Sequence, residues 1–254
     1  MKYVLFIKSY IHNYYWKTNC LSASERLKNG GAILNFAGMI EDSYQHKGLR
    51  HKLVKKLGKK GISNKTVLDA IGKVPRHLFM DQAFLKFAYE DNAFPIDEGQ
   101  TISQPYTVAY QTQLLNPQYD DQVLEIGTGS GYQACVLAKI CRKVYSIERF
   151  HKLYIKSKNA LKNLGYKNIK TFHGDGYQGL PAFAPYDKIL VTAAATYVPH
   201  ALKEQLKIGG CLVIPVGSDS GQVMHRITKR EADDYLDEAF DAFKFVPFQH
   251  GKVM

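Results

Sequence analysis

The sequence lacks any long apolar run. A membrane-spanning helix needs about 18 to 20 consecutive apolar residues, whereas the apolar run at residues 3–7 ends after five residues at Lys8. Five residues are too few for the core of a signal peptide, and no small-residue cleavage site follows them. We therefore expect no membrane span and no membrane partner, and the sequence gives no indication of secretion.

The sequence is also poor in cysteine. Its four cysteines form no C-x-x-C pair and have no metal-like spacing to histidine, so no metal site is expected; they are Cys20, Cys135, Cys141 and Cys211. The last three fall in a predicted helix and a predicted strand, where cysteine usually acts as a small buried apolar residue. This use of cysteine favours a reducing, cytoplasmic compartment.

Positive charge, by contrast, is in excess: 34 Lys and Arg against 23 Asp and Glu give a formal net charge of +11. A polyanionic partner therefore has to be considered. Seven of the basic residues lie within residues 47–60, interleaved with leucine and valine at helical spacing, which predicts an amphipathic helix with a solvated basic face. No aromatic ladder or zinc motif accompanies them, so we expect no nucleic-acid partner.

The chain divides by composition near residue 39. Residues 1–38 show no clear periodicity and carry five basic side chains against one acid. We expect them to form a loosely ordered basic extension, and Met39 is a candidate start of translation. Residues 39–254 are expected to form one domain, in which residues 39–121 are a helical prelude and residues 122–254 form a sheet with C-terminal strands.

From residue 122 short runs rich in Val, Ile and Leu alternate with helix-length segments. Most of the runs are too apolar to alternate cleanly, as is typical of strands buried on both faces: 122–126, 143–147, 168–172, 188–192 and 211–216. Two further strands are expected at 222–229 and 242–247. Helices are expected at 64–73, 104–115, 132–142, 151–164 and 197–207. This alternation predicts an α/β fold with a doubly wound, mostly parallel sheet.

The clearest local motif is Glu125-Ile126-Gly127-Thr128-Gly129-Ser130-Gly131, directly after the first predicted strand. Alternating glycines let the backbone turn sharply and approach a ligand. A dinucleotide-binding loop would need its third glycine where Tyr132 stands. The spacing E-x-G-x-G-x-G is typical instead of class I methyltransferases, and it predicts S-adenosylmethionine as cofactor. We expect Gly127, Thr128 and Gly129 to contact it, with Glu125 near its amino-acid portion; a tight turn without a ligand is the lesser alternative.

Two more acids follow predicted strands. Glu148 can accept hydrogen bonds from both ribose hydroxyls of a nucleoside, although an acid favoured by a helix N-terminus would look the same. Asp175 can accept from the adenine amino group while Gly176 allows close approach, although an isolated Asp-Gly pair is more often a plain turn. Their positions at the carboxyl ends of strands, where α/β folds bind ligands, favour the functional interpretation.

A polar run lies upstream of the sheet, Gly99-Gln100-Thr101-Ile102-Ser103-Gln104-Pro105-Tyr106. By local physics alone, Thr101 or Ser103 would cap the helix that Pro105 helps to start. Helix capping is therefore the better interpretation of the run when it is taken by itself.

Taken together, these segments resemble the protein-L-isoaspartate O-methyltransferases. The matching segments run in order over roughly residues 45–250: Val74-Pro75-Arg76 with Phe79, then 99–106, 123–133, 173–176, Tyr186-Asp187, 191–194, Gly209-Gly210 and Phe245-Val246-Pro247. Many methyltransferases share the glycine loop, whereas the G-Q-T-I-S-Q-P run is close to diagnostic of this one family.

The resemblance implies a role for Ser103 at the active site, between the cofactor and a substrate carboxylate. The implied reaction moves a methyl group from S-adenosylmethionine to the free α-carboxylate of L-isoaspartyl residues in damaged proteins and peptides. Other residues expected beside cofactor or substrate are Thr101, Ile102, Thr192, Val246 and Pro247. A carboxylate is already ionised at neutral pH, so the serine is needed to orient it and not as a nucleophile.

Three other functions are weighed against this one. A methyltransferase that acts on bases usually has a D/N-P-P-Y/F loop after the fourth strand, where this chain has Ala193-Ala194-Ala195-Thr196. A nicotinamide-dependent oxidoreductase would need a different glycine spacing. A non-catalytic module that binds the cofactor is disfavoured because Ser103 stands within an intact motif. No coiled coil or dimer stripe is present, so a monomer is expected.

Overall fold

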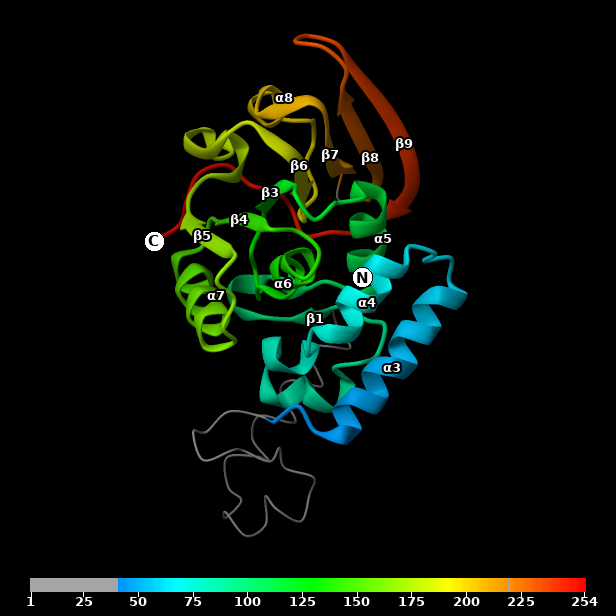
Figure 1. Ribbon diagram of the computed structural model, residues 1–254. Coiled ribbons are helices and arrows are strands. Elements are labelled where there is room, and N and C mark those ends of the chain that lie inside the picture. The colour runs from blue at the N-terminus through cyan, green and yellow to red at the C-terminus, as the bar shows by residue number, and fades with distance from the viewer. Residues whose placement is uncertain (1–40, 219) are drawn as a thin grey trace. The chain divides into compact units, whose positions relative to one another are not determined.

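Seven strands form the main sheet of this computed structural model, which describes residues 41–218 and 220–254. The expected basic extension, residues 1–38, and the candidate start Met39 lie outside the described residues. Across the sheet the strand order is β5-β4-β3-β6-β7-β8-β9 (Figure 1). The strands are β3 (Gln122–Ile126), β4 (Lys143–Glu148), β5 (Ile169–His173), β6 (Tyr186–Val191), β7 (Leu206–Ser218), β8 (Gly221–Lys229) and β9 (Tyr235–Phe243).

The first five of these strands run parallel, and β8 and β9 are antiparallel to their neighbours. The chain enters the sheet at β3, moves outward to β5, and returns through β6 to build the other half. This reversal opens a crevice at the carboxyl ends of β3 and β6, which is where open α/β sheets bind ligands. The doubly wound, mostly parallel sheet predicted from the sequence is confirmed.

Residues along each central strand alternate between two hydrophobic cores, one on each face of the sheet. The first core contains Val123, Leu190 and Val213, and the second contains their neighbours Leu124, Ile189 and Leu212. Burial of side chains of this size contributes about 1.5–3 kcal/mol each. The helices that contribute to the first core are α3 (Tyr44–Lys59), α4 (Lys65–Lys73), α5 (Pro105–Leu115), α6 (Tyr132–Ala138) and α7 (His151–Asn163). Helix α8 (His200–Glu204) contributes Leu202 to the second core.

A small hairpin and several short 3-10 turns lie before the sheet. Strands β1 (Phe94–Pro95) and β2 (Thr101–Ile102) pair antiparallel, so the chain leaves the hairpin at Ser103. The 3-10 helices among the described residues are η1 (Arg76–Phe79), η2 (Gln82–Phe87), η3 (Asp97–Gly99), η4 (Gly176–Gln178) and η5 (Pro181–Phe183). Within the described residues, no helix has the length and apolar character needed to cross a membrane.

Several elements differ from the sequence prediction, and one of them, β7, is longer than the strand predicted at 211–216. The helix predicted at 132–142 ends at Ala138, and the one predicted at 197–207 shortens to His200–Glu204 because β7 already begins at Leu206. The strand predicted at 242–247 is wrong beyond Phe243, since the last strand is β9. Strand β9 lies at the edge of the sheet and has acidic residues at exposed positions, as is common in edge strands that resist pairing with another chain. These acidic residues interrupt the apolar pattern by which a strand is recognised in the sequence.

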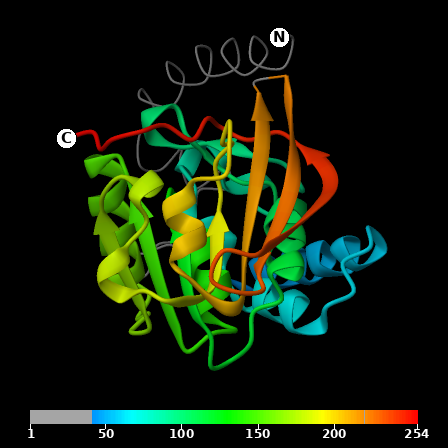
Figure 2. The ribbon, with the colours of Figure 1, turned by 90° about the horizontal axis from the view of Figure 1, so that it is seen from above.

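The sequence analysis placed Val246 and Pro247 in a strand. In the structure they lie in the segment that follows β9. That segment runs back across the carboxyl ends of the parallel strands, as Figures 1 and 2 both show. An isolated bridge between Ala194 and Pro247 and another between Phe150 and Val253 fasten it there. The end of the chain thus joins the crevice from the far side of the sheet.

Candidate active site

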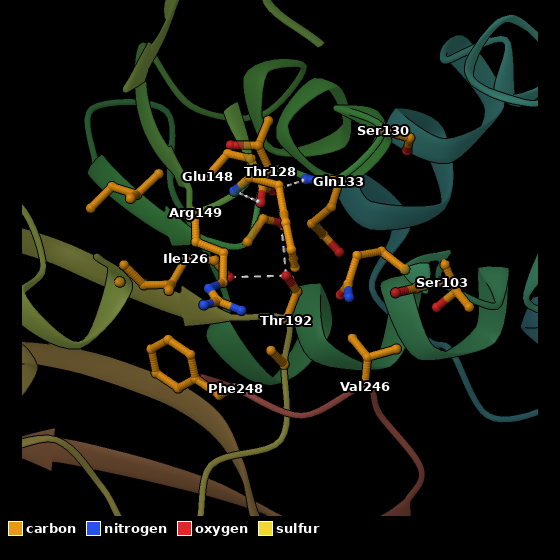
Figure 3. A pocket seen from close by; sticks show the side chains of 18 of the residues that line it. Ser103, Ile126, Thr128, Ser130, Gln133, Glu148, Arg149, Thr192, Val246 and Phe248 are labelled. Carbon is orange, nitrogen blue, oxygen red and sulfur yellow. Dashed lines mark hydrogen bonds between the residues drawn. The ribbon is translucent and has the colours of Figure 1, made fainter. Parts of the chain in front are cut away.

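A pocket lies at the carboxyl ends of β3, β4 and β6. Most of the predicted site residues are in its wall: Thr101, Ile102, Ser103, Gly127, Thr128, Gly129, Glu148, Gly176, Thr192, Val246 and Pro247. In Figure 3, Ser103 and Val246 lie on one side, Glu148 and Arg149 lie on the other, and Thr192 lies between them. Segments far apart in the sequence thus meet around one space.

The glycine loop is held by the backbone of its neighbour strand. The backbone N–H groups of Gly127 and Thr128 both donate to the carbonyl of Ile147, at 2.9 and 3.2 Å. Gly127 has a φ of 97°, and a Cβ added there would lie 2.6 Å from Thr192 Oγ1. Only glycine therefore fits the first position of the loop.

Thr192 takes part in the same support. Its hydroxyl lies 2.9 Å from the carbonyl oxygens of both Ile126 and Gly127, and it can donate its single proton to one of them at a time. Thr192 therefore lines the pocket while its hydroxyl is engaged with the loop backbone. It is better suited to shape the cleft than to bind a substrate through that group.

Glu125 is fully buried behind the loop and is not part of the pocket lining. The Ser146 hydroxyl donates to its Oε2, and the Thr128 and Ser146 hydroxyls share a hydrogen bond of 2.6 Å. Its Oε1 has no hydrogen-bond partner among the described residues. Burial raises the pKa of Glu125 to about 8, because desolvation disfavours the carboxylate. Its link to the pocket is indirect, through Ser146 and Thr128.

Glu148 lies at the end of β4 and lines the pocket. Its carboxylate accepts from the backbone N–H of Gly129 at 2.8 Å and of Phe150 at 3.0 Å. Burial raises the pKa of Glu148, and the backbone donors act against that shift. Each oxygen keeps a further lone pair, so the carboxylate can still accept hydrogen bonds from a ligand.

Asp175 is not part of the lining, although Gly176 is. Its two carboxylate oxygens accept from the backbone N–H groups of Tyr177 at 3.0 Å and of Gly251 at 2.9 Å. A Cβ added to Gly176 would lie 2.8 Å from a ring carbon of Phe248, so this position too requires glycine. Asp175 thus forms a turn, as the local interpretation held, and also holds the end of the chain against the pocket.

Arg149, Phe248 and Gln249 line the pocket and were missed by the sequence analysis. The Arg149 guanidinium donates to the side chain of Gln249 and to the carbonyl of His250. Phe248 stacks on Tyr177, with ring centroids 4.0 Å apart. The position of Arg149 directly after Glu148 was a usable clue, whereas nothing local predicts that the chain end folds back here.

On the other side of the pocket, Ser103 depends on a buried arginine. Arg76 is 0% exposed and donates from Nη2 to the carbonyl of Ser103 at 3.1 Å and of Asn92 at 3.0 Å. Its Nη1 donates to the carbonyl of Ala88 at 2.7 Å. Burial lowers the pKa of Arg76 to about 10, so it stays protonated at neutral pH. These contacts fix the backbone from which the Ser103 side chain extends.

The first turn of helix α5, which follows Ser103, is capped by an acidic side chain that lies outside the helix and earlier in the sequence. The N-cap residue Gln104 makes no side-chain cap. Asp91 instead accepts from the backbone N–H of Tyr106 at 2.8 Å, and Lys60 lies 2.5 Å from the same carboxylate. The Gln104 side chain donates to the Asp91 carbonyl at 3.0 Å. The helix start is thus supported from outside the run, and the capping interpretation of Ser103 is not what the structure shows.

A family model described as protein-L-isoaspartate(D-aspartate) O-methyltransferase (PCMT) matches residues 48–253. The chain belongs to this family. A curated relative from Christiangramia forsetii, named protein-L-isoaspartate O-methyltransferase, is 53% identical over 213 residues, which cover 84% of this chain and 100% of the relative. The resemblance drawn from the sequence motifs is thereby confirmed.

Two solved structures are similar to this fold. One, a protein-L-isoaspartate O-methyltransferase, is 30% identical with a TM-score of 0.72, over 78% of this chain and 65% of its own. The other is a putative PCMT from Plasmodium falciparum in complex with S-adenosyl-L-homocysteine. It is 26% identical with a TM-score of 0.70, over 79% of this chain and 98% of its own. The chain thus has the fold of this family across most of its described length.

Proposed function

We propose that the chain transfers a methyl group from S-adenosylmethionine to the free α-carboxylate of L-isoaspartyl residues in damaged proteins and peptides. The observation that carries the proposal is the position of Ser103, in the pocket wall together with the glycine loop and on a backbone fixed by Arg76. The methyl ester formed this way cyclises without further catalysis to a succinimide, which reopens in part to normal aspartate.

The pocket fits this cofactor by its own polar groups. Glu148 has acceptor capacity left for the two ribose hydroxyls, and the backbone of Gly127–Gly129 is open to close approach. Thr101 and Ile102 in β2 and Gly176 would contribute further contacts, all three being in the wall. We assign Glu125 and Asp175 a supporting role, because neither lines the pocket. When bound, the cofactor supplies an electrophilic methyl group on a sulfonium.

The chain's own task in the reaction is to orient the acceptor. An isoaspartyl carboxylate is ionised at neutral pH, so no strong base is required. The Ser103 hydroxyl donates to one carboxylate oxygen and leaves the other free to attack. With the cofactor bound, a carbon–oxygen bond would form as the carbon–sulfur bond broke, which would neutralise the charge of the carboxylate and that of the sulfonium. Alignment of the reacting atoms is therefore the main catalytic contribution.

The substrate backbone would lie along the segment that follows β9. The Val246 carbonyl accepts from Ala194 N at 2.8 Å, and Phe248 N donates to the Ala194 carbonyl at 2.7 Å. This pairing with Ala194 holds Val246 and Pro247 in the pocket wall. We propose that these two residues and Thr192 shape the side of the cleft that receives the isoaspartyl residue.

The test supplies radiolabelled S-adenosylmethionine with paired peptides that contain either L-isoaspartate or L-aspartate at one position. Base-labile label on the isoaspartyl peptide alone is the expected result. Equal labelling of both peptides, or of neither, would refute the proposal.

A cytoplasmic location, a monomeric state and the absence of a nucleic-acid partner remain predictions. The first is supported by Cys135, Cys141 and Cys211, which are free and buried. Size-exclusion chromatography with light scattering, run with and without duplex DNA, would test the other two.

A further inference from the structure

Gln133 is the second residue of α6, is 7% exposed and lines the pocket. Its amide nitrogen donates to the Thr112 hydroxyl at 3.0 Å. The Thr112 hydroxyl donates its own proton to the Val108 carbonyl at 2.7 Å, so it can only accept from Gln133. This fixes the orientation of the Gln133 amide: its nitrogen faces Thr112, and its oxygen faces away from Thr112.

That oxygen, Gln133 Oε1, is buried and has no hydrogen-bond partner within residues 41–218 and 220–254. An unpaired buried acceptor costs about 1–3 kcal/mol, and native proteins contain few of them. Glu125 Oε1 is in the same condition, but Glu125 is not part of the pocket lining. Gln133 therefore offers an unsatisfied acceptor in a wall where a ligand is expected to bind.

The position of Gln133 in the pocket limits which group of a bound cofactor could donate a hydrogen bond to its oxygen. In the view of Figure 3 it lies between Thr128 and Ser103, with Glu148 and Arg149 on the other side of Thr128. Its partner Thr112 belongs to α5, the helix that starts two residues after Ser103. Glu148 accounts for the ribose side of the pocket, so the acceptor lies toward the amino-acid portion of the cofactor. That portion has one donor group, its α-ammonium.

We propose that Gln133 Oε1 accepts a hydrogen bond from the α-ammonium of S-adenosylmethionine and so aligns the amino-acid portion of the methyl donor. This inference rests on the proposed cofactor. A hydrogen bond to a charged group contributes about 1.5–3 kcal/mol, which corresponds to about 10- to 150-fold in affinity. The same contact would recognise S-adenosylhomocysteine, which keeps the ammonium group.

The test is calorimetric binding of S-adenosylhomocysteine and of its deaminated analogue, which lacks only the amino group. Gln133→Met should weaken binding of S-adenosylhomocysteine about 10- to 150-fold and leave binding of the analogue within about threefold of wild type. Gln133→Glu keeps an acceptor toward the ligand, and the Thr112 hydroxyl can turn its proton from the Val108 carbonyl to the new carboxylate, so this variant should restore the preference for the amino compound. Gln111→Met is the matched control. Gln111, in α5, is buried like Gln133, but its side chain donates to the Val191 carbonyl and does not line the pocket.

Equal weakening of both ligands by Gln133→Met, or no weakening of either, would overturn the assignment. Thermal unfolding of each variant separates loss of fold from loss of the contact. The proposed function has its own readout, because wild-type protein that binds neither ligand would refute the cofactor and this inference together. Wild-type binding with no effect of Gln133 would refute the inference alone.

Discussion

The two sides of the pocket are built by different kinds of contact. The glycine loop is held by backbone hydrogen bonds to the adjacent strand β4 and by two side chains at the ends of neighbouring strands, Thr192 and Glu148. The Ser103 side is held by buried charged side chains from elsewhere, Arg76 and Asp91, which are 27 and 15 residues from the groups they bind. The comparison indicates that the glycine-loop side, where we propose that the methyl donor binds, depends on sheet topology. The Ser103 side, where we propose that the substrate carboxylate binds, depends on a few long-range polar contacts.

The largest expected effect is on the loop. Gly127→Val places a side chain at a left-handed φ of 97° with its Cβ 2.6 Å from Thr192 Oγ1. Strain and overpacking together cost several kcal/mol, so binding of S-adenosylhomocysteine should fall by about 100-fold or more. Calorimetry measures this directly.

The matched control for that change is Gly165→Val. Gly165 also has a positive φ, 76°, but a Cβ there meets nothing within 4 Å. It should destabilise the fold modestly and leave ligand affinity unchanged. If both variants bind the ligand equally well, the tight fit between the loop and Thr192 is not what shapes the donor side.

The second effect concerns the Ser103 side. Arg76→Lys keeps the charge but cannot reach the carbonyls of Ala88, Asn92 and Ser103 together. Misplacement of the acceptor by about 1 Å can lower the rate about 100-fold, so kcat should fall about 10- to 100-fold while the Kd of the cofactor stays within about threefold. Steady-state kinetics with saturating cofactor, beside calorimetry, provides the two readouts.

Arg50→Lys is the control for this variant. Arg50 is another buried arginine, and it bonds the carbonyl of Gly72 and the hydroxyl of Tyr89, away from Ser103. It should affect stability and not kcat. A parallel loss of cofactor affinity and kcat in Arg76→Lys would mean that the two sides of the pocket are not independent.

The last effect concerns the stability of the fold and not the ligand or the reaction: it is a pH dependence that comes from Glu125. Its pKa is about 8 in the folded protein against 4.5 as the ordinary value. Between these pH values the folded state holds a proton that the unfolded state has lost, so stability falls as pH rises and the loss is complete above pH 8. The loss is at most about 5 kcal/mol.

Urea unfolding of wild type and Glu125→Gln at pH 5 and pH 8 measures this term, because all other groups cancel in the difference. The variant should lose less stability between the two pH values than wild type. An identical pH dependence of the two proteins would show that Glu125 is ionised in the fold.

The comparison also explains what the sequence could and could not predict. The loop of residues 125–131 is visible locally, because alternating glycines directly after an apolar strand have few other uses. Ser103 was assigned by family resemblance only, since its support from Arg76 and Asp91 is invisible to local periodicity. The same limit hid β9, whose exposed acids mask its alternation, and the return of the chain end to the pocket, which Phe248 and Gln249 line. Contacts between residues that are far apart in the sequence cannot be predicted from the pattern of a short segment.

The central claim is that the glycine loop binds the donor while Ser103 orients the acceptor, and Ser103→Ala tests it most directly. One preparation would be used to measure the Kd of S-adenosylhomocysteine and the kcat for an isoaspartyl peptide at saturating cofactor. Loss of a hydrogen bond to a carboxylate should lower kcat about 10- to 150-fold, with the Kd within about twofold of wild type. An unchanged kcat, or a Kd that rises as much as kcat falls, would contradict the account.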